Sequence, residues 1–178
     1  VPINTYKQNF QGTLSFGSVD KDNGNMDIAF QITTPGVNFD LSRAGKEASH
    51  GWFFFSTYNT ELANTLLEVN ASKNDKDFIL AVNWKKAEEY LKAGKGKKVL
   101  DAKELEGLAY FIPCPKSPHG VDVDPTGEYI VGSGKLAALI PVFSFTKIQK
   151  AIEAKEFEGD FGGIPVIKAI REGLAANR

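Results

Sequence analysis

The sequence predicts an all-β fold, specifically a partial β-propeller with two short helices, and three observations lead to this prediction. Short apolar runs rich in β-branched and aromatic residues recur along the chain, and each is bounded by Gly, Pro, Asn or Asp. The 178 residues include 13 phenylalanines and 17 glycines, as is typical of short strands joined by tight turns. A strand followed by a helix also occurs twice, which indicates an internal repeat.

The predicted strands follow one another along the whole chain. They are Gly12–Gly17, Met26–Thr33, Gly51–Tyr58, Asp77–Trp84, Leu108–Pro113, Val121–Val123, Glu128–Gly132 and Ala138–Phe145. Asp20–Asn25 is predicted as a hairpin turn rather than a calcium loop, because no glutamate follows at the twelfth position. Asp124–Gly127 has aspartate first, proline second and glycine fourth, which predicts a type I turn.

Helical segments follow two of the strands. Lys85–Gly94 ends in a glycine suited to a helix C-terminus, and Thr146–Glu153 begins with a threonine suited to an N-cap. Six lysines lie between Lys85 and Lys98. We interpret them as a solvated face, and binding of an acidic partner through Lys92–Lys98 is the alternative.

The two helices reveal the repeat. Phe78–Trp84 and its helix align with Leu139–Phe145 and its helix, and each pair is preceded by a strand that begins after a glycine. The first copy carries a longer insertion, Asn59–Lys76. Repeats that cannot bury their own faces stack around a channel, as propeller blades do. We therefore expect two to three blades over residues 1–178, which are too few to close a ring, and hence a fragment of a propeller domain.

The composition excludes several classes of protein. Lys and Arg number 21 against 22 Asp and Glu, so the net charge of −1 provides no field to attract nucleic acid. No run approaches the ~18 apolar residues of a membrane-spanning helix. A single cysteine excludes an internal disulfide, and two histidines with one methionine exclude a metal centre built wholly from such ligands of this chain.

His119 is the first candidate for chemistry. It lies between Pro118 and Gly120 at the entry of a predicted strand, and in a propeller that end of the innermost strand faces the central channel. A metal ligand, a polar group lining the channel and a packed turn residue all fit this position. His50 precedes a glycine in a similar way but lacks the proline.

Oxygen donors form a second candidate group. Tyr58-Asn59-Thr60-Glu61 stands where the insertion begins, and Asp75 and Asp77 stand where it ends. Carboxylates and carbonyls from a long loop are the ligands that calcium prefers. Ordinary capping of the loop is the alternative.

These residues carry a resemblance to the nitrous-oxide reductase family. Lys116-Ser117-Pro118-His119-Gly120, the turn that follows it and Gly134-Lys135-Leu136 match that family's pattern in spacing and order. Ser56–Glu61, Asp77-Phe78, the helix end Lys92–Gly94 and Met26–Gln31 match in the same order. The resemblance covers roughly Asp20 to Glu153 and is closer to the divergent, atypical branch of the family.

The resemblance implies a copper-dependent oxidoreductase of denitrification. Such enzymes are periplasmic homodimers that reduce nitrous oxide to dinitrogen and water, with electrons from a small cytochrome c or cupredoxin. Each subunit has a seven-bladed propeller, in which seven histidines hold a four-copper sulfide cluster, and a cupredoxin domain with a binuclear copper centre. Residues 1–178 would be a piece of the propeller domain without the cupredoxin domain, and we expect this piece to be inactive by itself.

The resemblance also implies roles for individual residues. His119 matches one histidine of the copper cluster, and its other ring nitrogen should donate to a carbonyl or carboxylate. Tyr58, Glu61 and Asp77 match calcium ligands, with Asp75 an alternative to Asp77 because the insertion is longer here. Ser117 stands where the family has an asparagine that binds the calcium.

Two other classes of function remain open at the level of sequence. A non-redox propeller, for example a lactonase-like enzyme or a binding scaffold, would share the blades and the Pro-His-Gly turn. A pure interaction module would use the lysine-rich segment.

Overall fold

The computed structural model describes residues 12–34, 37–58, 77–95, 98–115, 118–134, 139–168 and 172–173. Its strands are β1 (Gly12–Val19), β2 (Met26–Thr34), β3 (Asn38–Ala44), β4 (Trp52–Tyr58), β5 (Asp77–Asn83), β6 (Val99–Asp101), β7 (Ala109–Cys114), β8 (Val121–Val123), β9 (Tyr129–Gly132), β10 (Pro141–Ser144), β11 (Phe157–Phe161), β12 (Ile164–Ile167) and β13 (Glu172–Gly173). The helices are α3 (Trp84–Lys92), α4 (Phe145–Glu153) and the short 3₁₀ helix η1 (Glu47–Ser49). The prediction of an all-β fold with short helices is confirmed.

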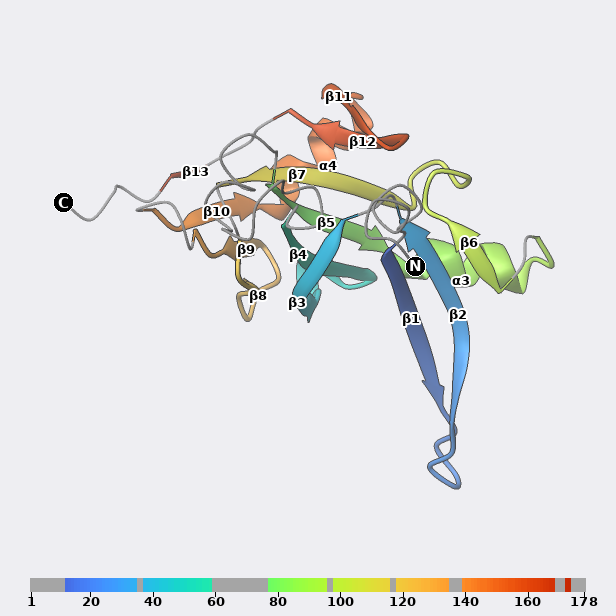
Figure 1. The fold of residues 1–178 in the computed structure, drawn as a ribbon. Helices are drawn as coiled ribbons and strands as arrows, with labels where there is room; N and C mark the ends of the chain where they lie inside the picture. Colours follow the sequence, from blue (N-terminus) through green and yellow to red (C-terminus); the bar gives the residue numbers. More distant parts are fainter. Residues whose placement is uncertain are drawn as a thin grey trace, which may run out of the picture.

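Within those residues the strands form three sheets (Figure 1). The central sheet has the order β11-β12-β7-β5-β4-β3, the hairpin sheet has the order β1-β2-β6, and the C-terminal sheet has the order β13-β10-β9-β8. β3-β4-β5-β7 and β8-β9-β10-β13 are antiparallel meanders whose order in space follows the chain. Parallel pairing occurs between β12 and β7 and between β2 and β6.

The central sheet has an apolar core on each face. Phe78, Leu80 and Val82 of β5 pack in one cluster with the hairpin sheet and Ala87 of α3. Ile79 and the other alternate residues of β5 pack in a second cluster with the C-terminal sheet and α4. Successive side chains of a strand point to opposite faces, so burial of both faces explains why β5 is apolar along its length rather than alternating.

The internal repeat is visible in the helices. α3 follows β5 and α4 follows β10, and each helix begins after a polar N-cap. Asn83 Oδ1 accepts a hydrogen bond from the backbone N–H of Lys86 at 3.0 Å, and Ser144 Oγ accepts one from Lys147 at 3.2 Å. The predicted N-cap at Thr146 is therefore wrong, because the helix begins two residues earlier and Ser144 reaches the free N–H group.

The predicted turns are confirmed. The N–H of Gly24 donates to the carbonyl of Asp20 at 2.8 Å, and the N–H of Gly127 donates to the carbonyl of Asp124 at 3.0 Å. Gly94 follows α3 with a φ of 70°, as expected of a glycine at a helix C-terminus.

The sequence does not predict several of the observed strands. β3 contains Asp40, Ser42 and Arg43, and β11 contains Gly159 and acidic residues, so neither shows an apolar run. Both lie at edges of the central sheet, where side chains are less buried and polar residues are tolerated.

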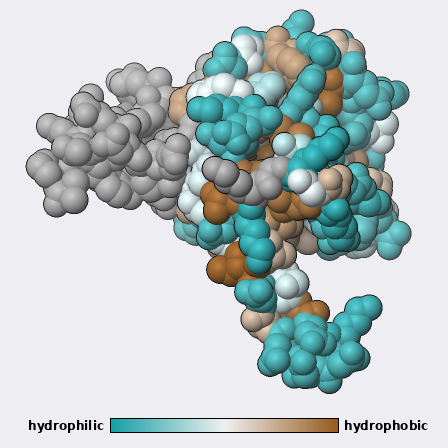
Figure 2. All heavy atoms as spheres, turned by 90° about the vertical axis from the view of Figure 1, so that its right-hand side faces the viewer, coloured by the Kyte–Doolittle hydropathy of each residue, from teal (hydrophilic) through white to brown (hydrophobic). Residues whose placement is uncertain are grey.

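The β1–β2 hairpin projects from the rest of the molecule, and its tip is hydrophilic (Figure 2). Leu14 and Ile32 are buried near the body, whereas Met26 near the tip is exposed. In the part of the chain described here, no helix is both long enough and apolar enough to cross a membrane.

Candidate functional site

The candidate site lies where β3, at one edge of the central sheet, meets β8 of the C-terminal sheet. Each of these strands is the first of its meander. Polar contacts link the two regions. Arg43 Nε lies 3.1 Å from Asp122 Oδ1, and Lys46 Nζ donates to the carbonyl of Val123 at 2.5 Å. The N–H of Ala48 also donates to the carbonyl of Thr126 at 3.1 Å. These contacts hold the two first strands side by side.

His119 enters this region just before β8. Pro118 is buried, and Gly120 has a φ of 128°, a conformation that other residues rarely adopt. A Cβ atom on Gly120 would lie 3.4 Å from Cδ1 of Leu41, so the turn also packs closely against β3. The flanking residues therefore fix the backbone at His119.

The imidazole of His119 is directed at Asp40. Its Nδ1 atom lies 3.1 Å from Oδ2 of Asp40, and the side chains are 52% and 17% exposed, respectively. The approach is at ion-pair distance without the alignment of a hydrogen bond, and no described residue donates an aligned hydrogen bond to this buried oxygen.

This arrangement determines which nitrogen of His119 is available. With Nδ1 facing a carboxylate, Nε2 is the nitrogen that can bind a metal ion or accept a proton. A carboxylate behind the imidazole is the usual outer partner of a metal-binding histidine, and it is also the partner of a histidine that acts as a general base. The pair can therefore serve either chemistry.

Asp40 is a candidate site residue that the sequence does not identify. The sequence predicts a carbonyl or carboxylate partner for His119 but gives no position for it. Asp40 lies in β3, which shows no strand pattern, and the only local signal is one carboxylate between Phe39 and Leu41. Pairing of β3 with β4 and packing against β8 bring it to His119.

The backbone gathers part of the predicted calcium site. The register that pairs Thr57 with Phe78 places Tyr58 and Asp77 at the same end of β4 and β5. Asp77 also pairs with Cys114 of β7, and its side chain is buried. Glu61, Asp75 and Ser117 lie outside the described residues, and the side chain of Tyr58 is not described either.

Other candidate residues make contacts within their own part of the chain. The ring of His50 meets that of Trp84 edge-on, with centroids 5.8 Å apart, and the backbone N–H of His50 donates to the carbonyl of Glu47. In the lysine-rich segment, Lys92 Nζ lies 3.1 Å from Glu88 Oε2, one turn away on α3, and both side chains are largely exposed. A surface pair of this kind contributes little stability.

The carboxylates with lowered pKa values lie in β8, in the turn that follows it and beside the N-terminus of α4. The N–H of Val123 and the Arg43 guanidinium lower the pKa of Asp122, and the hydroxyl of Thr126 and nearby N–H groups lower that of Asp124. The hydroxyls of Ser144 and Thr146 lower the pKa of Glu128. Burial, and then the charge of Glu106, raise the pKa of Tyr110.

A cavity of about 310 Å³ opens elsewhere, between the β6–β7 loop, the end of α4 and the β11–β12 hairpin. Tyr110 and Phe157 line it, with Glu106 and Lys155 at 3.4 Å from each other among its lining residues. Neither His119 nor Asp40 contributes to it. Across residues 12–173, with the gaps given above, no three His, Cys, Asp or Glu side chains converge as a metal site.

Comparison with known proteins gives a consistent result. The chain is 29% identical over 146 residues to nitrous-oxide reductase of Pseudomonas fluorescens, covering 75% of this chain and 21% of that protein. It is 26% identical over 143 residues to the enzyme of Stutzerimonas stutzeri (73% and 21%) and 27% identical over 156 residues to that of Ralstonia nicotianae (79% and 23%). No model of a protein family matches.

The resemblance found in the sequence is thus confirmed as a divergent and partial one. The chain spans about a fifth of the length of the curated relatives that it matches. The relatives are oxidoreductases by name.

Proposed function

We propose that this chain is part of the copper-cluster domain of a nitrous-oxide reductase, which reduces nitrous oxide to dinitrogen and water. The observation that carries the proposal is His119, in the position that matches a cluster histidine, with its Nδ1 atom 3.1 Å from a carboxylate. The similarity to three nitrous-oxide reductases supports the same assignment.

In this proposal the three sheets are neighbouring propeller blades. The central and hairpin sheets share one apolar core, and the central and C-terminal sheets share another, as blades stacked face to face do. The first strand of each meander would then line the central channel. Those strands are β3, which contains Asp40, and β8, which follows His119.

The residues present fit one ligand of a copper centre. Imidazole suits copper, and a carboxylate on the far nitrogen orients the ring and raises its basicity. His119 would bind through Nε2, and Asp40 would hold the proton on Nδ1. A copper cluster held there would bind nitrous oxide and relay to it the two electrons that an electron-donor protein delivers. One imidazole cannot hold four coppers, so we expect no turnover by this chain without further ligands.

Calcium is the second metal in the proposal. Tyr58, Glu61 and Asp77 would bind it, with Asp75 and Ser117 as further candidates. The shared end of β4 and β5 supports this grouping, because the strands bring the first and third of these residues to one edge. Calcium there would link the ends of β4 and β5.

The wider setting follows from the same proposal. The intact enzyme would be a periplasmic homodimer with a cupredoxin domain, and a small cytochrome c or cupredoxin would deliver its electrons. The pair His119–Asp40 also suits a general base. A hydrolytic, lactonase-like propeller is therefore the second candidate function.

The test is the copper content of the complete protein that contains this chain, purified without oxygen. We expect about six coppers per subunit, four in the cluster and two in the cupredoxin domain, falling to about two in His119→Ala. His50→Ala is the matched control, because it removes the other histidine of the chain and should leave the copper content unchanged.

A copper-free protein would contradict the reductase assignment and favour the hydrolytic candidate. Full copper content in His119→Ala would show that another residue binds the cluster.

A further inference from the structure

A buried hydroxyl lies between the two members of the candidate pair. Ser56 is on β4 and is fully buried. Its Oγ atom accepts hydrogen bonds from the N–H of Leu41 at 3.1 Å and the N–H of Gly120 at 3.2 Å, and it donates to the carbonyl of Leu41 at 3.2 Å. Leu41 follows Asp40, and Gly120 follows His119, so this one hydroxyl contacts both segments.

The contact to β3 occurs at a bulge. β3 and β4 pair regularly at Phe39 with Thr57 and again at Ser42 with Phe55, so Asp40 and Leu41 together face Ser56. A bulge leaves an extra residue without its place in the strand ladder and redirects the side chains beside it. Here the Ser56 hydroxyl binds the N–H and carbonyl of Leu41, and Asp40 is turned toward His119.

The contact to the turn fixes the other partner. The N–H of Gly120 points to Ser56, while its carbonyl accepts from Ser133 at 3.1 Å. Both peptide groups around Gly120 are therefore held. The backbone of His119, the residue before it, is therefore fixed relative to β3.

We propose that Ser56 is a positioning residue, which sets the bulge of β3 and the turn before β8 so that Asp40 holds Nδ1 of His119 and leaves Nε2 free for a ligand. This inference rests on the proposed function in one respect only, namely that the ligand of Nε2 is copper. The geometric part, the choice of the protonated nitrogen, is a property of this chain without metal.

The matched control is the next residue of the same strand. Thr57 is also fully buried, but its hydroxyl donates to the carbonyl of Phe78 at 3.0 Å, inside the central sheet. Thr57→Val therefore removes a buried hydroxyl from β4 without touching Asp40 or His119. A general loosening of the strand would affect both variants, whereas positioning predicts an effect of Ser56→Ala only.

The experiment is nitrogen NMR of the 178-residue chain with ¹⁵N-labelled histidine at a pH where the imidazole is neutral. The chain has two histidines, and His119→Ala assigns their signals. We expect the Nδ1-protonated form of His119 to predominate in the wild type. In Ser56→Ala the ratio of the Nδ1-protonated to the Nε2-protonated form should fall by about tenfold. This is the change expected when His119 loses an interaction with Asp40 that is worth one ordinary hydrogen bond. Thr57→Val should match the wild type.

Each outcome decides a different point. An unchanged ratio in Ser56→Ala, with a clear change in Asp40→Ala, would overturn the role of Ser56 and leave the Asp40–His119 pair intact. Equal changes in Ser56→Ala and Thr57→Val would also overturn it. No change in Asp40→Ala would overturn the pair itself, and with it the positioning role, while the copper measurement tests the reductase assignment separately.

Amide hydrogen exchange on the wild type covers the case in which Ser56→Ala does not fold. The proposal requires that the N–H groups of Leu41 and Gly120 exchange slowly, together with the strand amides of β4. Exchange at the rate of exposed amides would contradict it.

Discussion

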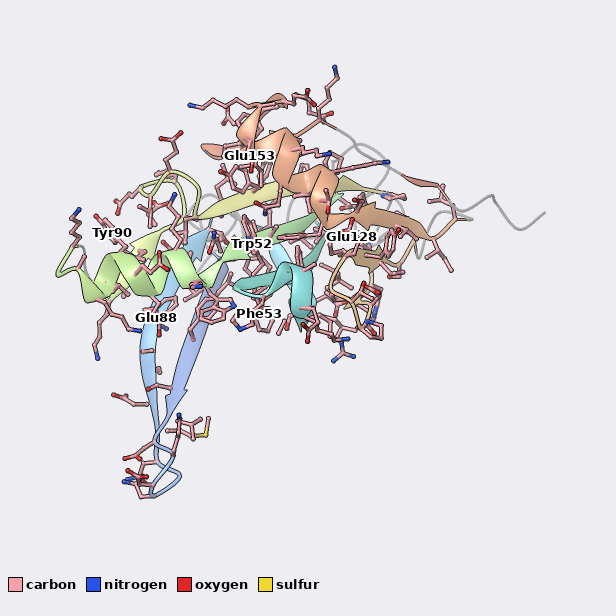
Figure 3. All side chains as sticks on the ribbon, turned by 180° about the vertical axis from the view of Figure 1, so that it is seen from behind. Trp52, Phe53, Glu88, Tyr90, Glu128 and Glu153 are labelled. Atoms are coloured by element: carbon pink, nitrogen blue, oxygen red, sulfur yellow. The ribbon has the colours of Figure 1, made fainter. Side chains whose placement is uncertain are left out.

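Glu128 joins the turn after β8 to the beginning of α4 (Figure 3). Its carboxylate accepts hydrogen bonds from the hydroxyl of Ser144 at 2.5 Å and the hydroxyl of Thr146 at 2.7 Å, and its backbone carbonyl accepts from the N–H of Phe145 at 2.7 Å. A negative charge at the N-terminus of a helix is also favourable. These contacts stabilise the ionised carboxylate and lower its pKa below the usual value of 4.5.

The lowered pKa of Glu128 gives a pH-dependent stability. A carboxylate whose pKa is lower in the folded state stabilises the fold fully above its unfolded-state pKa, and the effect disappears as the pH falls through the folded-state pKa. Glu128→Gln should lower the free energy of unfolding by about 1–2 kcal/mol at neutral pH. Urea denaturation at neutral pH and at about pH 3 measures this difference, which should shrink at the lower pH. An equal difference at both values would show that the charge is not involved.

The sequence around Asp40 does not predict its contact with His119. In the sequence it is one carboxylate in a segment without periodicity, whereas His119 is marked by its proline and glycine neighbours. Only the approach of β3 to β8 gives Asp40 a partner.

At the scale of elements, the turn at Asp124–Gly127 also anchors the central sheet. Gly127 has a φ of 73°, and a Cβ atom there would overlap the backbone carbonyl of Lys46, just before η1. This close approach lets the N–H of Ala48 reach the carbonyl of Thr126. The turn thus joins β8 and β9 and holds the β3–β4 connection as well.

Gly127→Ala and Gly24→Ala separate backbone strain from the close approach. Gly24 has nearly the same φ, 74°, but a Cβ atom there meets nothing within 4 Å. Gly24→Ala should therefore cost only the strain of the left-handed conformation, about 1 kcal/mol. Gly127→Ala should cost about 2 kcal/mol more, since the turn must move off Lys46. Urea denaturation of both variants tests this, and equal losses would contradict the close approach.

The N-caps of the two repeated helices give a second comparison. Asn83 and Ser144 occupy equivalent positions, and Asn83→Ala should lower stability by about 1 kcal/mol. Ser144→Ala should cost more, because Ser144 also donates to Glu128. A double-mutant cycle of Ser144→Ala with Glu128→Gln measures that coupling, and purely additive losses would show that the two side chains act independently.

At the scale of the whole molecule, the central sheet connects two cores. Phe78 and Phe111 belong to the core shared with the hairpin sheet, while Ile79 and Ile112 belong to the core shared with the C-terminal sheet. These residues alternate along β5 and β7. Neither core can unfold without exposing one face of the same strands, so the described layers should lose structure together.

The two tryptophans report on the two cores separately. Trp84 packs against the first core and Trp52 belongs to the second. Trp52→Phe and Trp84→Phe each leave one tryptophan. In each variant, the urea transition followed by fluorescence should coincide with the transition followed by circular dichroism. A fluorescence transition that precedes the circular dichroism in one variant would indicate that one layer unfolds first.

The sequence by itself determined the class of the fold, the tight turns and the repeat of strand and helix, and it singled out His119 as the leading candidate for a site residue. These features are local: apolar runs, turn residues at fixed offsets, and a histidine between proline and glycine each depend on a few neighbouring residues. The missed strands are edge or short strands, in which partly exposed positions carry polar side chains and no period.

Tertiary structure decided what the local patterns leave open. The Thr146 N-cap gave way to Ser144 because the end of β10 sets where α4 begins. The pairing of Asp40 with His119 and the three contacts of Ser56 join residues far apart in the chain, across β3, β4 and the turn before β8. No spacing along the sequence encodes these contacts: those of Ser56 with Leu41 need the pairing of β3 with β4, and those that reach His119 and Gly120 need the central and C-terminal sheets to pack against each other.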